Sequence, residues 1–116
     1  MRRDLVIILE MIEAGRRIAR FIGDRDLAAF EADEAARDAV LWNFTVLGEA
    51  ANQVSASLKA AHPDVAWSAP IRMRNRIVHG YWDVDLGILY TAARESIPSL
   101  IDRLRIIAGR FDSGGS

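Results

Sequence analysis

Apolar residues recur along this chain at intervals of three and four, and this spacing restricts the fold more than any other feature of the sequence. Side chains spaced in this way share one face of an α-helix. In the first segment the pattern joins Leu5, Ile8, Leu9, Ile12, Ala19 and Ile22. No alternation typical of strands competes with it, and no internal repeat is visible. We therefore predict an all-α protein.

Capping residues, glycines and prolines predict where the helices begin and end. The expected helices cover residues 3–22, 34–61, 68–79 and 85–108, with a short extra helix at 27–30. The expected N-caps are Asp26, Asp33, Ser68 and either Asp83 or Asp85, and the expected stops are Gly23, the His62-Pro63 pair and Gly80. Pro98 should kink the last helix. The prediction is an up-and-down bundle of four principal helices, with residues 1–109 as the domain and 110–116 as a disordered tail.

Composition excludes several classes of protein. The length of 116 residues fits one domain, and 51% hydrophobic residues are enough for a core. The absence of cysteine excludes disulfide scaffolds, thiol nucleophiles and cysteine-ligated zinc. With two histidines, we expect neither a metal site nor a cofactor. No apolar run is long enough to span a membrane and no signal-peptide pattern follows Arg2-Arg3-Asp4, so we expect a cytoplasmic protein.

The predicted helix 34–61 carries apolar residues on two sides. One arc is expected to face the core and holds Val40, Phe44, Leu47, Ala51, Val54 and Leu58. The other side places Trp42, Val46 and Ala50 beside Glu49 and Gln53. Two interpretations remain open here: a contact surface for a partner, or a face covered by a neighbouring segment such as 27–32.

The formal net charge of −1 hides a basic segment. No acidic residue occurs from Val65 to Trp82. On a helical wheel the polar face of this segment holds Arg72, Asn75, Arg76 and His79, and the apolar arc holds Ile71, Met73, Ile77 and Val78. Arg74 falls inside the apolar arc, which makes it the exceptional residue of the segment.

An arginine in an apolar arc must be paired or must face a cleft, because an unpaired buried guanidinium costs several kcal/mol. A salt bridge from Arg74 to a carboxylate such as Glu49 would satisfy this requirement. A cleft that binds an anionic group such as phosphate would satisfy it as well. His79 lies in the last helical turn, where the helix dipole favours the imidazolium. It could transfer protons, or it could simply cap the helix.

The string from Arg72 to Trp82 resembles the signature of the HEPN superfamily, specifically that of the HepT-like minimal ribonuclease toxins. That signature is an arginine, a polar residue directly after it, a histidine a few positions on and a tyrosine two beyond. The matching residues here are Arg74, Asn75, His79 and Tyr81. The similarity covers about residues 2–108 and includes Gly48-Glu49-Ala50-Ala51. Gly80 and Trp82 depart from the pattern, in which a polar residue and a phenylalanine are usual.

The resemblance implies a metal-independent endoribonuclease, the toxin of a type VII-like toxin–antitoxin system, which acts as a homodimer. It implies Arg74 and His79 as catalytic residues and Asn75 as a supporting one. Arg72 and Arg76 would either guide RNA phosphates or belong to a solvated helix face. An MntA-type minimal nucleotidyltransferase antitoxin would neutralise the toxin by transferring AMP to Tyr81.

Elementary chemistry agrees with these implications. RNA can be cut without a metal when its own 2′-OH attacks the adjacent phosphate, provided that a base, an acid and a stabilising cation are present. One histidine cannot easily be base and acid in the same step, whereas a two-fold axis would bring a second Arg74 and His79 into one cleft. Two alternatives remain: a non-catalytic helical partner that presents nucleotide or substrate to a nucleotidyltransferase, and a structural bundle with an Arg74–Glu49 pair.

Overall fold

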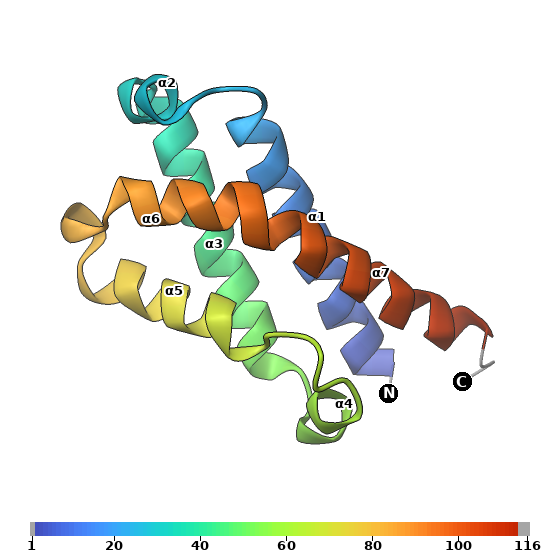
Figure 1. The fold of residues 1–116 in the computed structure, drawn as a ribbon. Coiled ribbons are helices and arrows are strands. Elements are labelled where there is room, and N and C mark those ends of the chain that lie inside the picture. Colours follow the sequence, from blue (N-terminus) through green and yellow to red (C-terminus); the bar gives the residue numbers. More distant parts are fainter. Residues whose placement is uncertain (1, 114–116) are drawn as a thin grey trace.

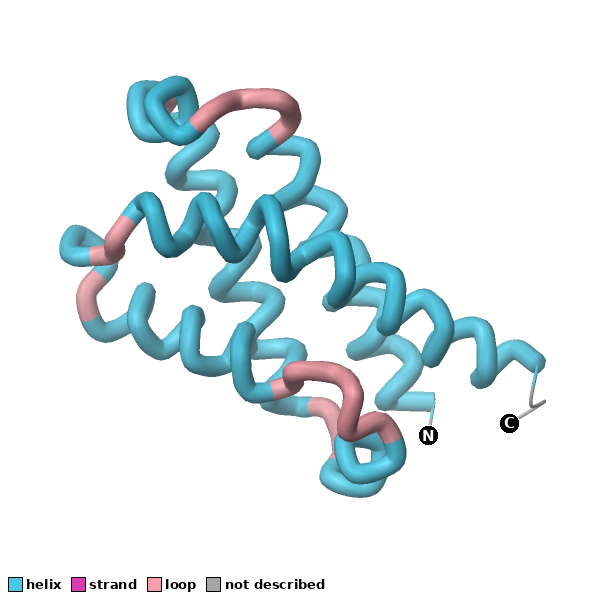
Figure 2. Tube along the Cα trace, viewed as in Figure 1, coloured by secondary structure: helices cyan, strands magenta, loops and turns pink. Residues whose placement is uncertain are grey.

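The computed structural model describes residues 2–113, and every regular element in that range is helical (Figure 1). In chain order the elements are α1 (Arg2–Ile22), α2 (Leu27–Ala32), α3 (Glu34–Gln53), α4 (Ala56–Ala61), α5 (Ser68–His79), the 3-10 helix η1 (Tyr81–Asp83), α6 (Leu86–Thr91), the π-helical turn η2 (Ala92–Ser96) and α7 (Ile97–Ser113). Short loops join them (Figure 2). The predicted all-α class is confirmed.

Helix α3 has the central place in the bundle. Helices α1 and α5 both pack against α3, and α7 packs against α1. Helices α6 and α7, joined through η2, form one continuous arm that crosses in front of α3 (Figure 1, orange to red). The fully buried large side chains are Ile8, Met11, Ile18, Ile22, Phe30, Val40, Leu47, Leu89 and Leu104. No helix among the described residues is long and apolar enough to cross a lipid bilayer.

The predicted core face of the segment 34–61 is confirmed, since all six of its predicted core residues are buried, four of them on α3 and the other two, Val54 and Leu58, beyond its end. Two positions predicted on the buried face of α1 are wrong, because Leu9 is half exposed and Ala19 is exposed. The helix is rotated so that its buried face passes through Ile7, Met11, Ala14 and Ile18. Periodicity therefore identified the helix correctly but placed the centre of its buried face too far toward Leu9 and Ala19.

The predicted single helix 34–61 is wrong at one point, because the chain leaves the helical conformation between α3 and α4. Val54 has extended angles (φ −62°, ψ 138°), and the Ser55 hydroxyl oxygen caps α4 by accepting a bond from the Leu58 N–H. Asp4 of α1 accepts bonds from the Ser55 N–H (3.0 Å) and the Ser55 hydroxyl (2.6 Å). The break is thus stabilised by a residue 51 positions away.

Three of the predicted caps are confirmed and one is wrong. The carboxylates that accept N–H bonds at helix starts are those of Asp26, Asp33 and Asp85. Ser68 is the first residue of α5 and makes no cap, because Trp67 before it already has helical backbone angles (φ −56°, ψ −35°). The Ser68 hydroxyl instead accepts a bond from Arg72 at 2.8 Å.

The C-terminal arm also differs from the prediction. Pro98 has no N–H to donate to the carbonyl of Arg94, and the π-helical turn η2 lies directly before it. The arm then continues to Ser113 instead of ending near residue 108. A disordered tail over 110–116 is therefore wrong for residues 110–113, which are helical, and residues 114–116 lie outside the described residues.

Candidate active site

The site is built along the line of contact between α3 and α5, which we call the α3–α5 seam. At its centre is Gly48: a Cβ atom there would lie 2.6 Å from the carbonyl oxygen of Pro70 and closer still to the side chain of Arg74. Only glycine leaves room for α5 at this position. The close approach brings Arg74 of α5 beside Glu49 of α3.

The Arg74 guanidinium is oriented by two acceptors. Its Nη2 donates to Oε1 of Glu49, forming an ion pair, and its Nη1 donates to Oδ1 of Asn75 at 2.6 Å. Its Nε is buried without a partner. The side chains of Arg74 and Glu49 are 28% and 47% exposed. The pairing with Glu49, one of the two possibilities for Arg74, is therefore present, and the Arg74 side chain is still partly exposed.

Arg74 and His79 do not face each other within this chain. Five residues along an α-helix turn the side chain by about 140°. Arg74 faces α3, whereas the exposed His79 lines a hollow of about 350 Å³ together with Arg76, Gly80 and Asp83. The Gly80 N–H caps α5 by bonding to the Arg76 carbonyl, and no described residue is hydrogen-bonded to the imidazole of His79. His79 therefore forms no capping hydrogen bond, which was one of the two roles considered for it.

The predicted polar face of α5 is largely confirmed. Arg72, Arg76 and His79 are exposed. Asn75 is only half-buried and turns toward Arg74 as its hydrogen-bond acceptor. Val78, predicted in the apolar arc, is exposed. Among the side chains that the structure describes, residues 3–111, no three His, Asp or Glu groups gather in a metal-binding arrangement.

Tyr81 lies in η1, just beyond the end of α5, and its side chain returns to α3. Its hydroxyl donates to Oδ1 of Asp38 at 2.9 Å. This hydrogen bond, together with the negative charge of Asp38, raises the pKa of Tyr81. Asp38 was missed in the sequence, although it lies eleven residues before Glu49 and hence three helical turns away on the same face of α3.

Apolar side chains are exposed along the same seam. The pairs Asp38–Tyr81 and Glu49–Arg74 show that α5 runs antiparallel to α3, which places Trp42 and Val78 at a similar level between them. The exposed fractions are 66% for Trp42, 58% for Val78, 50% for Tyr81 and 87% for Trp82. We call these four residues the seam patch. Exposed large apolar side chains on neighbouring elements are typical of contact sites.

The alternative in which residues 27–32 cover Trp42 is wrong. Phe30 of α2 is fully buried and packs against Tyr90 of α6, with ring centroids 5.9 Å apart. Val46 is partly buried and Ala50 is buried, while Trp42 stays open to solvent. On this side of α3 Trp42 is therefore exposed while Val46 and Ala50 are largely covered, and a contact surface for a partner stays a prediction.

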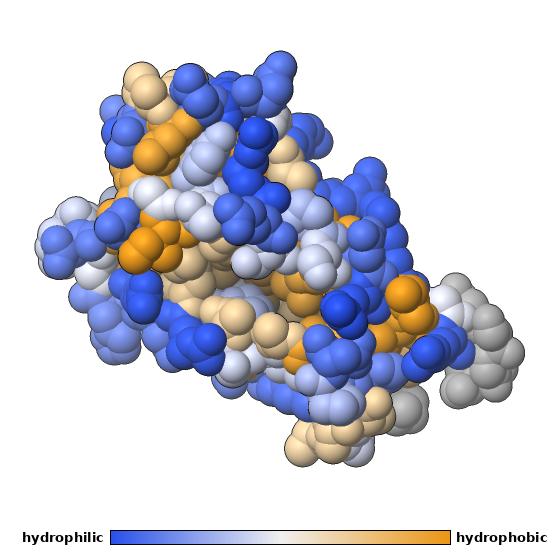
Figure 3. All heavy atoms as spheres, viewed as in Figure 1, coloured by the Kyte–Doolittle hydropathy of each residue, from blue (hydrophilic) through white to orange (hydrophobic). Residues whose placement is uncertain are grey.

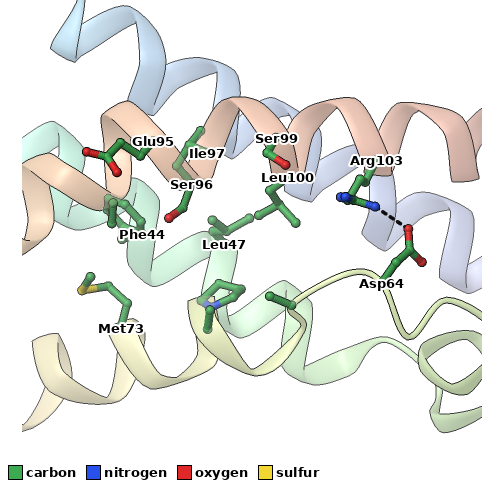
Figure 4. A pocket seen from close by; sticks show the side chains of 14 residues that line it. Phe44, Leu47, Asp64, Met73, Glu95, Ser96, Ile97, Ser99, Leu100 and Arg103 are labelled. Atoms are coloured by element: carbon green, nitrogen blue, oxygen red, sulfur yellow. Dashed lines mark hydrogen bonds and ion pairs between the residues drawn. The ribbon is translucent and has the colours of Figure 1, made fainter.

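A separate hollow of about 440 Å³ lies between α5 and the α6–α7 arm, and Figure 3 shows this recessed face. Its floor includes Phe44 and Leu47 of α3, Met73 lies on the α5 side, and an ion pair from Arg103 to Asp64 (2.6 Å) lies at one end (Figure 4). The residues that line it do not include Arg74, His79 or Tyr81. The predicted chemistry is thus located along the seam and at the end of α5, not in this hollow.

These features define an all-α, HEPN-like protein with an oriented arginine, an exposed histidine and an anchored tyrosine at the end of one helix. The chain belongs to the ribonuclease HepT-like family, whose model matches residues 11–107. The match extends from the middle of α1 into α7, so it includes the whole α3–α5 seam. The predicted family is confirmed.

Individual relatives agree with this assignment. The chain is 31% identical to "Probable ribonuclease HepT" of Thermococcus cleftensis, over 78% of this chain and 83% of that protein. It is 24% identical to "Putative RNase MJ1380" of Methanocaldococcus jannaschii, over 91% of this chain and 98% of that protein. No solved structure matches the chain at a significant level.

Proposed function

We propose that this chain is a metal-independent endoribonuclease, the toxin of a type VII-like toxin–antitoxin system. Membership of the ribonuclease HepT-like family and the names of its relatives support an RNase. The observation that carries the proposal is the placement of Arg74, which is fixed by Glu49 and Asn75 while its side chain stays partly exposed. A guanidinium held in this way fits a phosphate oxygen.

The proposed reaction uses groups that this chain supplies. The 2′-OH of RNA attacks the adjacent phosphorus, and the bond to the 5′-oxygen of the next nucleotide breaks. Arg74 stabilises the negative charge that develops on the phosphorane oxygens. His79 takes the proton from the 2′-OH or delivers one to the leaving oxygen, and a second histidine performs the other transfer. Asn75 keeps Arg74 in position, and Arg72 and Arg76 bind flanking phosphates.

A homodimer is part of the proposal because Arg74 and His79 point in different directions from one helix. A two-fold axis near the seam would place the arginine of one protomer beside the histidine of the other. The seam patch supports this arrangement, since it offers exposed apolar side chains next to Arg74. The site would then be completed only between two copies of the chain.

Mixing wild type with an inactive variant tests the shared site. Arg74→Ala and His79→Ala homodimers should each cleave RNA poorly without divalent metal. Wild type refolded with an equal amount of His79→Ala should form about half heterodimers and about a quarter wild-type dimers, and because each shared site needs both histidines, the rate per wild-type chain should fall to about half. An unchanged rate per wild-type chain in a mixture with verified heterodimers would contradict a shared site. Unmodified wild-type protein that cuts no RNA would instead favour the non-catalytic partner of a nucleotidyltransferase.

The proposal includes control by an MntA-like nucleotidyltransferase antitoxin that transfers AMP to Tyr81. The hydroxyl of Tyr81 lies at the surface, two residues beyond His79. AMP there would add bulk and negative charge near the arginines that receive RNA phosphate, and would therefore block the site. Intact mass and peptide mapping after incubation with the nucleotidyltransferase and ATP should locate one AMP on Tyr81. A Tyr81→Phe protein that is still modified would refute this assignment.

A further inference from the structure

The Tyr81 hydroxyl is bound by a carboxylate of its own chain. Its proton points to Oδ1 of Asp38 over 2.9 Å, and Asp38 is exposed on the outer side of α3. The neighbouring charges of Arg37 and Glu34 affect Tyr81 less and in opposite directions. Asp38 is thus the dominant group in the surroundings of this hydroxyl.

We propose that Asp38 is a catalytic residue in the nucleotidylation of Tyr81, holding the hydroxyl in place and accepting its proton. The inference rests on the proposed function, in which Tyr81 receives AMP. It adds the residue of this chain that makes the tyrosine oxygen a competent nucleophile. A neutral phenol is a weak nucleophile, and a base within hydrogen-bond reach activates such groups.

The co-reactant of Tyr81 is a nucleoside triphosphate, which the nucleotidyltransferase binds. A bond forms between the Tyr81 oxygen and the α-phosphorus. The bond from that phosphorus to the oxygen bridging to the β-phosphorus breaks, and its electron pair leaves with diphosphate. The proton moves from the Tyr81 hydroxyl to Asp38 and then to water.

The position of Asp38 suits this role. Tyr81 belongs to a three-residue 3-10 helix at the end of α5 and is half exposed, so its ring has little packing to hold it. Asp38 lies within the long helix α3, where its backbone is fixed. A rigid acceptor reduces the conformational freedom of the nucleophile before the triphosphate arrives.

Single-turnover transfer of labelled AMP from ATP, catalysed by the nucleotidyltransferase, tests the role. Asp38→Asn keeps an oxygen acceptor but cannot take the proton, so transfer should slow about a hundredfold. Glu34→Gln is the matched control. It removes one negative charge from the first turn of α3, near Tyr81 but without a bond to it, and should change the rate by less than about twofold.

Titration of the phenol gives a second readout that needs no antitoxin. The difference in ultraviolet absorbance between wild type and Tyr81→Phe isolates Tyr81 from Tyr90, the other tyrosine. Because Asp38 raises the pKa of Tyr81, the midpoint should be lower in Asp38→Asn than in wild type. An unchanged midpoint would overturn the contact on which the inference depends.

The outcomes separate the inference from the proposed function. Equal transfer rates in wild type and Asp38→Asn would overturn the role of Asp38 and leave Tyr81 as the modified residue. Equal slowing in Glu34→Gln would also overturn it, since surface charge and not proton acceptance would then control the rate. If the wild-type protein accepts no AMP at Tyr81, both the role of Asp38 and the transfer of AMP to Tyr81 would be overturned. The proposed RNA cleavage would still be tested separately, by the cleavage assay.

Discussion

Arg74 and Glu49 form an ion pair across the α3–α5 seam. Glu49 directly follows Gly48, the residue at which α5 packs most closely against α3. The Glu49 side chain is 47% exposed and the Arg74 side chain 28%, so solvent screens the pair and its stabilisation is on the order of 1 kcal/mol. The arginine is therefore poorly explained by stability alone. Its second acceptor, Asn75, fixes the guanidinium further, as expected of a group positioned for a ligand.

Replacing Arg74 should separate function from stability. Arg74→Ala should lower RNA cleavage at least about a hundredfold, because the cation facing the phosphorane is lost. The free energy of unfolding, measured in urea, should change by about 1 kcal/mol or less. Arg74→Lys should recover only part of the activity, since lysine lacks the fork that binds two acceptors. A large loss of stability with unchanged cleavage would support the purely structural bundle.

Gly48→Ala should push α5 away from α3. The added methyl group would overlap the Pro70 carbonyl and Arg74, so we expect a loss of about 1–3 kcal/mol in unfolding free energy and a loss of RNA cleavage. Gly109→Ala on α7 is the control, because its Cβ would meet nothing within 4 Å and alanine favours the helix by about 1 kcal/mol. Full activity in Gly48→Ala would show that the seam does not position the site.

The contact between Asp4 and Ser55 should make stability depend on acid pH. Burial is the largest single influence and would raise the pKa of Asp4, but the two hydrogen bonds from Ser55, together with positive charge such as that of Arg3, outweigh it, and the pKa is lowered from its ordinary value of 3.8. A lowered pKa stabilises the fold above the ordinary value, and this contribution is lost as pH falls through the lowered pKa. Asp4→Ala should cost about 2 kcal/mol at pH 7 and reduce the loss of stability below about pH 4. The exposed Asp102, replaced by alanine, should leave the acid profile unchanged; an equal effect of both variants would contradict the argument.

A charge in the seam patch should weaken self-association. Trp42→Glu should shift the protein from dimer to monomer in light scattering and lower RNA cleavage, since an unpaired charge would be buried at the dimer interface. Ile106→Glu is the matched control, because Ile106 on α7 is exposed to a similar degree (58%) but lies outside the patch. A dimer that is unaffected by Trp42→Glu would place the interface elsewhere.

Local patterns in the sequence predicted most of the fold. Asp26, Asp33 and Asp85 cap helices within their own first turns, so their roles can be read from neighbouring residues. The position of Arg74 in an apolar arc also follows from helical geometry alone. One of the two possibilities derived for it, the pairing with Glu49, is present in the structure, and the anion-binding cleft stays a prediction.

Features that depend on distant contacts could not be predicted. The break at Ser55 is stabilised by Asp4, and nothing near residue 55 indicates that partner. The bond from Tyr81 to Asp38 likewise joins residues 43 positions apart, on elements whose relative placement the sequence does not give. Helix periodicity identifies faces, but it does not tell which faces meet.

The attachment of α5 has a consequence for how such a protein can diversify. Helix α5 packs mainly on α3, whereas the core is shared by α1, α3 and the C-terminal arm. Residues on the outward side of α5 can therefore change identity without disturbing the core. Residues on its inner side cannot, because Gly48 leaves them no space to move. One side of this helix is free to vary while its other side is fixed.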